Sequence, residues 1–174
     1  MCNNTKGRIA DVVEELICTQ PGGKVTVQQV MELTQMNRQS FYYHFQDIND
    51  VLRRIVIRRF CMPMEFDPAE APETWCRRGL NLMKEQKTLL RRISRELGSG
   101  RMYELLSPVF RPQVERLIPA KPDQDRQQRE LAVDAISYSL LCTATGMLTD
   151  REQLDVETTM ERLRAVLATL GVKL

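Results

Sequence analysis

Apolar residues recur along this chain at intervals of three and four, which is the spacing of one face of an α-helix. The first such stripe consists of Ile9, Val12, Val13, Leu16 and Ile17. It ends before the Pro21-Gly22-Gly23 run, and similar stripes follow in most later segments. No alternating run of apolar and polar residues is long enough to be a convincing β-strand. The pattern therefore predicts an all-α protein.

Residues 62–72 interrupt this pattern, because Pro63, Pro68 and Pro72 stand there among acidic residues. Proline has no backbone N–H and tends to end or kink a helix. We therefore expect a first domain over residues 1–61, a linker over 62–72 and a second domain over 73–174.

The stripes of the second domain predict four long helices, and the last of them carries Val156, Met160, Leu163, Leu167 and Leu170. One runs from Leu82 to Leu97 and stops at Gly98, and the next should be kinked by Pro108 and Pro112. The third covers residues 123–148, and its second half has almost no polar face. A helix of that kind has to be buried on several sides. In a domain of this size, burial against another subunit is a common solution.

The stretch that says most about function is residues 24–52. Thr26 and Gln29 have the spacing of a capping box, so a helix should begin directly after Thr26. A turn is expected at Thr34-Gln35-Met36, and Asn37 can cap the helix that follows it. The stretch thus predicts a helix, a short turn and a second short helix.

The second helix of this stretch should have one buried edge and one polar face. Phe41 and Phe45, four residues apart, point to the same inner side. The other side carries Arg38, Gln39, Ser40, Tyr42 and Tyr43. A short helix of this composition is built like a reader of the DNA major groove, where Arg suits guanine and Gln suits adenine.

The run NRQSFYYHF resembles the recognition helix of the TetR family of bacterial transcription regulators. The family has a cap, two variable polar residues, Ser or Thr, an aromatic residue or Leu, and then Tyr-x-His-Phe. The matching positions are Asn37, Ser40, Phe41, Tyr42, His44 and Phe45. Together with the Asp-Ile that follows, the run also resembles the branch containing regulators of dihydroxyacetone kinase. Gln35 departs from the family, which usually has Gly there, and a positive φ at this position would cost free energy.

The resemblance implies a sequence-specific DNA-binding regulator, a repressor that binds a palindromic operator as a homodimer and responds to an effector in its C-terminal domain. It also implies that the last two long helices form the dimer interface, with small residues such as Ala144 and Gly146 permitting close approach. It places Tyr42 against a phosphate and leaves Tyr43 able to reach backbone or base.

Other residues of the stretch have roles that follow from their places in it. Thr26 can cap its helix and present the helix N-terminus to a phosphate, and Lys24 is a weaker phosphate candidate. His44 should pack at the end of its helix and bond a phosphate or a backbone group. The DNA contacts that we expect are Lys24, Thr26, Asn37, Arg38, Gln39, Ser40, Tyr42, Tyr43 and His44.

Composition and charge exclude several other classes of protein. The net charge is only +2, but residues 1–62 hold eight Lys and Arg against six acids, so the excess lies in the expected DNA-binding part. Five scattered cysteines without a C-x-x-C pair argue against a disulfide framework or zinc site and fit the cytoplasm. The uncharged stretch 135–149 is too short for a membrane span. No pattern of an enzyme, a metal site or a cofactor site is visible, so we expect none of these.

In the second domain, a set of large side chains could line an effector cavity: Trp75, Met83, Tyr103, Phe110 and Tyr138. Core packing accounts for the same residues equally well. Two other functions stay open at this point. One is an activator controlled by a partner protein, and the other is a helical interaction protein that does not bind DNA.

Overall fold

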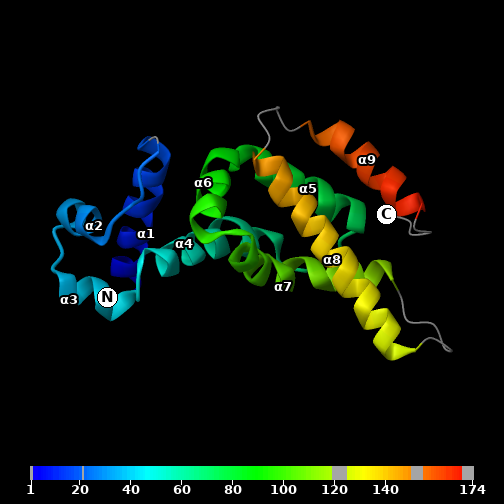
Figure 1. The fold of residues 1–174 in the computed structure, drawn as a ribbon, viewed down its shortest axis with the longest axis horizontal. Helices are drawn as coiled ribbons and strands as arrows, with labels where there is room; N and C mark the ends of the chain where they lie inside the picture. Colours follow the sequence, from blue (N-terminus) through cyan, green and yellow to red (C-terminus); the bar gives the residue numbers. More distant parts are fainter. Residues whose placement is uncertain (1, 21, 119–124, 150–154, 170–174) are drawn as a thin grey trace.

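A computed structural model describes residues 2–20, 22–118, 125–149 and 155–169, and these residues form helices and connecting loops without any β-strand. The molecule is elongated (Figure 1). A small head formed by the N-terminal helices lies at one end, and a larger body formed by the later helices lies at the other. The all-α prediction is confirmed for the described residues.

The head contains α1 (Cys2–Thr19), α2 (Val27–Thr34) and α3 (Arg38–His44), with α4 (Ile48–Val56) leading away from it. The inner faces of these helices meet in the head part of one hydrophobic core that continues into the body. Its fully buried members include Ile9, Val13, Val30, Phe41, Val51 and Leu52. The α1 stripe predicted from sequence supplies one wall of this core, although α1 begins earlier than that stripe. Pro21 lies outside the described residues.

The helix that begins at α4 does not stop at the expected domain boundary. It continues as a π-helical turn, η1 (Ile57–Cys61), and a 3₁₀ turn, η2 (Met62–Met64), before a loop over 65–71. Phe60 and Met64 are 2% and 0% exposed, because they insert into the core of the body. The Trp75 indole N–H donates to the Met64 carbonyl at 3.1 Å. Residues 62–64 are therefore helical, and the non-helical part of the predicted linker is shorter than expected.

The body begins with α5 (Pro72–Glu85) and α6 (Lys87–Leu97), where the sequence predicted one helix from Leu82 to Leu97. That expectation is corrected by a break at Gln86, whose φ of −97° and ψ of 10° are not helical. The buried stripe of α5 ends at Met83, and a continued helix would place Gln86 and Lys87 in the core. Turning the chain at Gln86 keeps both polar side chains out of it.

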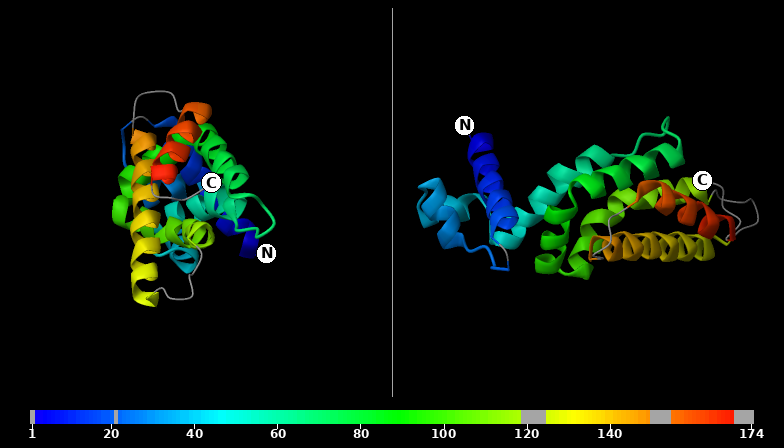
Figure 2. Two further views of the ribbon diagram at one scale, coloured as in Figure 1. Left: turned by 90° about the vertical axis from the view of Figure 1, so that its right-hand side faces the viewer. Right: turned by 90° about the horizontal axis from the view of Figure 1, so that it is seen from above.

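Two long antiparallel helices, α7 (Ser99–Leu117) and α8 (Arg126–Thr149), pack along one another and form the main layer of the body (Figure 2). α7 runs through Pro108 and Pro112 as one helix. The guanidinium group of Arg111 forms ion pairs with Glu130 and Asp134 on α8.

The last described helix, α9 (Val156–Thr169), packs against α5. Arg77 on α5 pairs with Glu157, and Glu73 pairs with Arg164. These ion pairs are exposed and add little stability. The buried residues Val156, Met160 and Leu167 supply the apolar face of α9.

The junction between head and body is made by α6, which contacts α1 and α4 on one side and α7 and α8 on the other. The guanidinium group of Arg92 donates to the carbonyls of Ile17 and Gln20, the latter at 2.6 Å. Because the last carbonyls of a helix have no partner within it, Arg92 caps the C-terminal end of α1. One residue of the body thereby fixes the end of the first head helix.

The turn between α2 and α3 makes a direct test of local strain possible. Gln35 has φ 55° and ψ 32°, the left-handed conformation that costs a residue with a Cβ about 1–2 kcal/mol. We expect Gln35→Gly to raise the free energy of unfolding by about 1 kcal/mol in urea titrations followed by circular dichroism. Gln28→Gly within α2 is the matched control and should lower it by about 1 kcal/mol. Equal losses in the two variants would contradict a strained turn.

Candidate nucleic-acid interface

The two helices that the sequence predicted around residues 27–44 are held at their ends by side-chain caps. The Thr26 hydroxyl accepts from the Gln29 backbone N–H at 3.3 Å, and the Gln29 side-chain oxygen accepts from the Thr26 N–H at 2.9 Å. Asn37 accepts from the Ser40 N–H at 2.8 Å and so starts α3. Both caps are made by the residues that the sequence predicted.

The outer face of α3 is exposed and carries aromatic and basic groups. Phe41 and Phe45 are 1% and 5% exposed and anchor the inner edge. Tyr42 and Tyr43 are 47% and 76% exposed, on adjacent sides of the helix. The carbon at the centre of the Arg38 guanidinium lies 5.7 Å from the centre of the Tyr42 ring, a cation–π contact. Arg38 and Tyr42 therefore form one unit at the surface.

His44 lies at the end of α3, half-buried, with its ring edge-on to that of Tyr43 at 4.9 Å between centroids.

Within the described ranges, no group of three or more His, Cys, Asp or Glu side chains could hold a metal ion. Burial raises the pKa of the Cys61 and Cys76 thiols to about 11, so neither is a thiolate near neutral pH.

A groove of about 530 Å³ lies beside α3 and extends to the N-terminal part of α1. From α3 and the preceding turn it is lined by Met36, Asn37, Gln39, Ser40, Tyr43 and His44. From α1 it is lined by Thr5 and Arg8. None of these side chains is acidic, and the Arg8 guanidinium donates to the Thr34 carbonyl at 3.3 Å. The sequence analysis missed Thr5 and Arg8, since only tertiary packing brings α1 beside α3.

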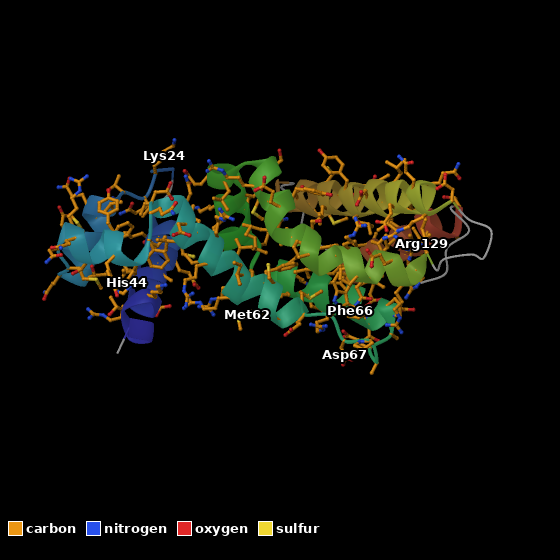
Figure 3. The ribbon with its side chains drawn as sticks, turned by 90° about the horizontal axis from the view of Figure 1, so that it is seen from below. Lys24, His44, Met62, Phe66, Asp67 and Arg129 are labelled. Atoms are coloured by element: carbon orange, nitrogen blue, oxygen red, sulfur yellow. The ribbon has the colours of Figure 1, made fainter. Side chains whose placement is uncertain are left out.

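Four of the predicted DNA contacts do not line this groove: Arg38 and Tyr42, which form the pair on the neighbouring face of α3, and Lys24 and Thr26. Lys24 is exposed on the loop before α2 and is distant from His44 in the view of Figure 3. Thr26 stands at the N-terminus of α2 with its hydroxyl already used in the capping box. The structure thus brings Asn37, Gln39, Ser40, Tyr43 and His44 together and leaves Lys24 and Thr26 outside the groove.

The basic residues of α4 and η1 divide into two groups. Arg58 pairs with Asp11 and Glu14 of α1, and Arg59 pairs with Glu14. Arg53 and Arg54 are exposed on the surface of α4. The paired arginines hold α1 against α4, whereas Arg53 and Arg54 belong to the solvated surface.

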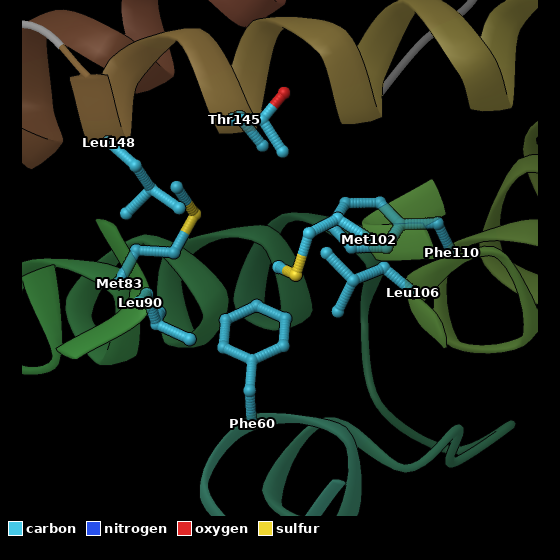
Figure 4. Close-up of a pocket in the computed structure, with 9 residues that line it drawn as sticks. Phe60, Met83, Leu90, Met102, Leu106, Phe110, Thr145 and Leu148 are labelled. Atoms are coloured by element: carbon cyan, nitrogen blue, oxygen red, sulfur yellow. The ribbon is translucent and has the colours of Figure 1, made fainter. Parts of the chain in front are cut away.

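The five effector-site candidates of the body do not line one cavity. Met83 and Phe110 line an apolar cavity of about 10 Å³ together with Phe60, Leu90 and Met102 (Figure 4). Trp75 is buried beside it, with its ring edge against that of Phe110. Tyr103 and Tyr138 pack on each other outside the lining, and Tyr138 is 55% exposed. A cavity of this size has room for about one water molecule.

α8 also has a property that the sequence analysis did not anticipate. Residues 126–148 are long enough and apolar enough to cross a membrane by length and composition alone, whereas the expectation considered only residues 135–149. Only 22% of the residues in the most apolar segment of this helix are buried within the chain. Core helices of globular proteins pass the same test, so this observation is weak support for a membrane span.

No protein-family model and no curated protein matches the sequence. Solved structures do match. A TetR transcriptional regulator from Streptococcus agalactiae 2603V has a TM-score of 0.68 at 18% identity, over 92% of this chain and 91% of that chain. The dihydroxyacetone kinase operon activator DhaS has a TM-score of 0.64 at 12% identity, over 95% of both chains.

A transcriptional regulator from Aquifex aeolicus VF5 has a TM-score of 0.58 at 18% identity, over 95% of this chain and 99% of that chain. The likeness extends over head and body alike, while the resemblance seen in the sequence was carried by the head alone. The chain therefore has the fold of TetR-type transcriptional regulators, as the motif at residues 37–45 predicted.

Proposed function

We propose that this protein is a transcriptional regulator that binds a palindromic DNA operator as a homodimer in the cytoplasm. The observation that carries the proposal is the exposed face of α3, capped by Asn37 and anchored by two buried phenylalanines. This helix sits at the far end of a fold that the solved TetR-type regulators share. A helix held in this way can enter the major groove without reorganising the head.

Different residues of α3 would contact the phosphate backbone and the base edges. Arg38 is stacked on Tyr42, so this pair would act together at the phosphate backbone. Gln39 and Ser40 line the groove beside the highly exposed Tyr43, where base edges would be met. Arg8, at the α1 side of the groove, would add a phosphate contact.

The charge of the groove favours DNA over a protein partner at this surface. Its lining contains Arg8 and no acidic side chain, and Arg38 stands on the neighbouring face of α3. An interaction protein without DNA binding would have no need for an acid-free groove beside an exposed helix. DNA affinity depends on such basic groups near phosphates.

The homodimer would form through the exposed face of α8, together with α9. This face consists of small or apolar side chains almost throughout: Ala135, Tyr138, Ser139, Cys142, Thr143 and Gly146. Packing two copies of the protein along this face would bury much of the apolar segment of α8 that a single chain leaves exposed. A two-fold dimer of this kind requires half-sites about one helical turn apart, or a multiple of it.

Repression relieved by an effector in the body is the regulation that we propose first. The apolar cavity reaches Leu90 on α6, and Arg92 on the same helix caps α1. A change in the body would therefore be passed to the head through α6. Activation controlled by a partner protein is the second candidate, favoured by a cavity of only about 10 Å³ and by the likeness to the activator DhaS.

The assignment of α3 as the reading helix predicts a clear loss of function. We expect the double variant Arg38→Ala with Tyr42→Ala to retain at least 100-fold less duplex DNA than the wild type in filter-binding assays, since each lost phosphate or base contact costs about 1–3 kcal/mol. Arg53→Ala with Arg54→Ala, on the exposed side of α4, is the matched control and should reduce retention only a few-fold. Unchanged binding in the α3 variant would show that another surface reads DNA.

The proposed dimer interface can be tested independently of DNA. We expect Thr143→Arg on the exposed face of α8 to convert the dimer into a monomer in light-scattering measurements, because a buried arginine without a partner is costly. Thr88→Arg on the exposed side of α6 makes the same chemical change and should leave the dimer intact. A dimeric Thr143→Arg protein with native helicity would place the interface elsewhere.

A further inference from the structure

The seam between α7 and α8 changes character along its length. Near the head it contains the apolar cavity, to which α7 contributes Met102, Leu106 and Phe110. α8 contributes Ala144, Thr145 and Leu148 to the same cavity. Farther from the head the seam contains two buried polar side chains, Gln113 on α7 and Ser137 on α8.

Neither of these polar side chains has a partner within the part of the chain that the structure describes. Gln113 is 3% exposed, and both its amide nitrogen and its amide oxygen are without a hydrogen bond. Ser137 is 1% exposed, and its hydroxyl also has no hydrogen-bond partner among the described residues. Burying a donor and an acceptor without partners costs free energy, and folded proteins rarely keep such groups without a use.

The register of the two helices places both groups on the inner side that leads to the cavity. Ser137 is seven residues before Ala144, which lines the cavity; this spacing is close to two whole helical turns and puts both on one face of α8. Gln113 is three residues after Phe110 on α7. The side chains of a helix lean towards its N-terminus, so Gln113 leans towards Phe110 and the cavity.

Several features would allow the seam to open. Met83 and Met102 line the cavity, and methionine side chains adapt their shape at low cost. Pro108 and Pro112 lie inside α7, Pro108 between the cavity residues Leu106 and Phe110, and Pro112 between Phe110 and Gln113. Each proline removes one backbone hydrogen bond from the helix, so this part of α7 resists bending less than an ordinary helix does.

The charged residues that flank Gln113 on α7, Arg111 and Glu115, are already paired with one another. Arg111 is the nearest basic residue in sequence to Gln113, and it is already paired with Glu130 and Asp134 on a partly exposed surface. An ionised ligand would be buried without a counter-ion, which is strongly unfavourable. An uncharged group with an adjacent donor and acceptor matches the Gln113 amide, because the two can exchange a pair of hydrogen bonds.

We propose that the α7–α8 seam binds a small uncharged molecule whose polar end, a carboxamide or a group of equivalent hydrogen bonding, pairs with Gln113 and Ser137 while its apolar body enlarges the cavity beside Phe110. This inference rests on the proposed function, since it supplies the chemical class of the effector. Its occupancy would press on Leu90 and thereby on α6, the helix that caps α1 through Arg92.

The test uses three carboxamides as probes, propionamide, hexanamide and benzamide, with the full chain and no DNA present. We expect at least one of them to raise the midpoint of thermal unfolding by about 2–4 °C at a concentration well above its Kd. Acetophenone replaces the amide NH₂ of benzamide by a methyl group and should give a smaller shift than benzamide. No shift with any of the three carboxamides would overturn the proposal.

The variant Gln113→Met keeps the length of the side chain and removes both unpaired groups. We expect it to abolish the carboxamide shift while the ligand-free protein unfolds at the wild-type temperature or above it. Gln128→Met on the exposed surface of α8 is the control and should keep the shift. A Gln113→Met protein that unfolds at a clearly lower temperature would show that the amide is already paired by water, and the proposal would fail.

These outcomes are distinct from failure of the proposed function. DNA retention by the wild-type protein reports on α3, whereas the carboxamide shift reports on the seam. A protein that binds DNA but shows no shift would refute only the inference about the ligand.

Discussion

The arrangement of the whole molecule depends on one shared core around α4 and α6. The helix that starts at Ile48 leaves the head and ends at Met64 inside the body, so both parts bury side chains of the same element. Arg92 then fixes the end of α1 from the side of the body. Because the head cannot tilt without disturbing these contacts, the position of α3 is set by the packing of the body.

Where the sequence predicted the structure well, the determining interactions were local. Thr26 and Asn37 each accept a hydrogen bond from a backbone N–H three residues later, so the start of each helix is specified within a single turn. The positive φ of Gln35 was indicated by the resemblance, because the family usually has Gly at this position. The same locality explains why a motif of nine residues was enough to indicate the fold of the whole chain.

Features that the sequence did not predict depend on residues distant along the chain. The helical continuation to Met64 is stabilised by Trp75, whose indole donates to the Met64 carbonyl. The break at Gln86 separates α5 from α6, and these two helices pack against different neighbours. Thr5 and Arg8 join the groove because α1 folds back beside α3. The effector candidates were chosen by residue type, which does not separate Met83 at the cavity from Tyr138 at the surface.

The central claim is that α3 reads DNA within a two-fold dimer, and the most direct test is to sequence what the purified protein retains from random duplex DNA at near-physiological salt. The account predicts an enriched palindrome whose half-sites lie about one helical turn apart, or a multiple of that spacing. A folded dimer that enriches no sequence would contradict it, and the protein would then have to be understood as a helical interaction protein.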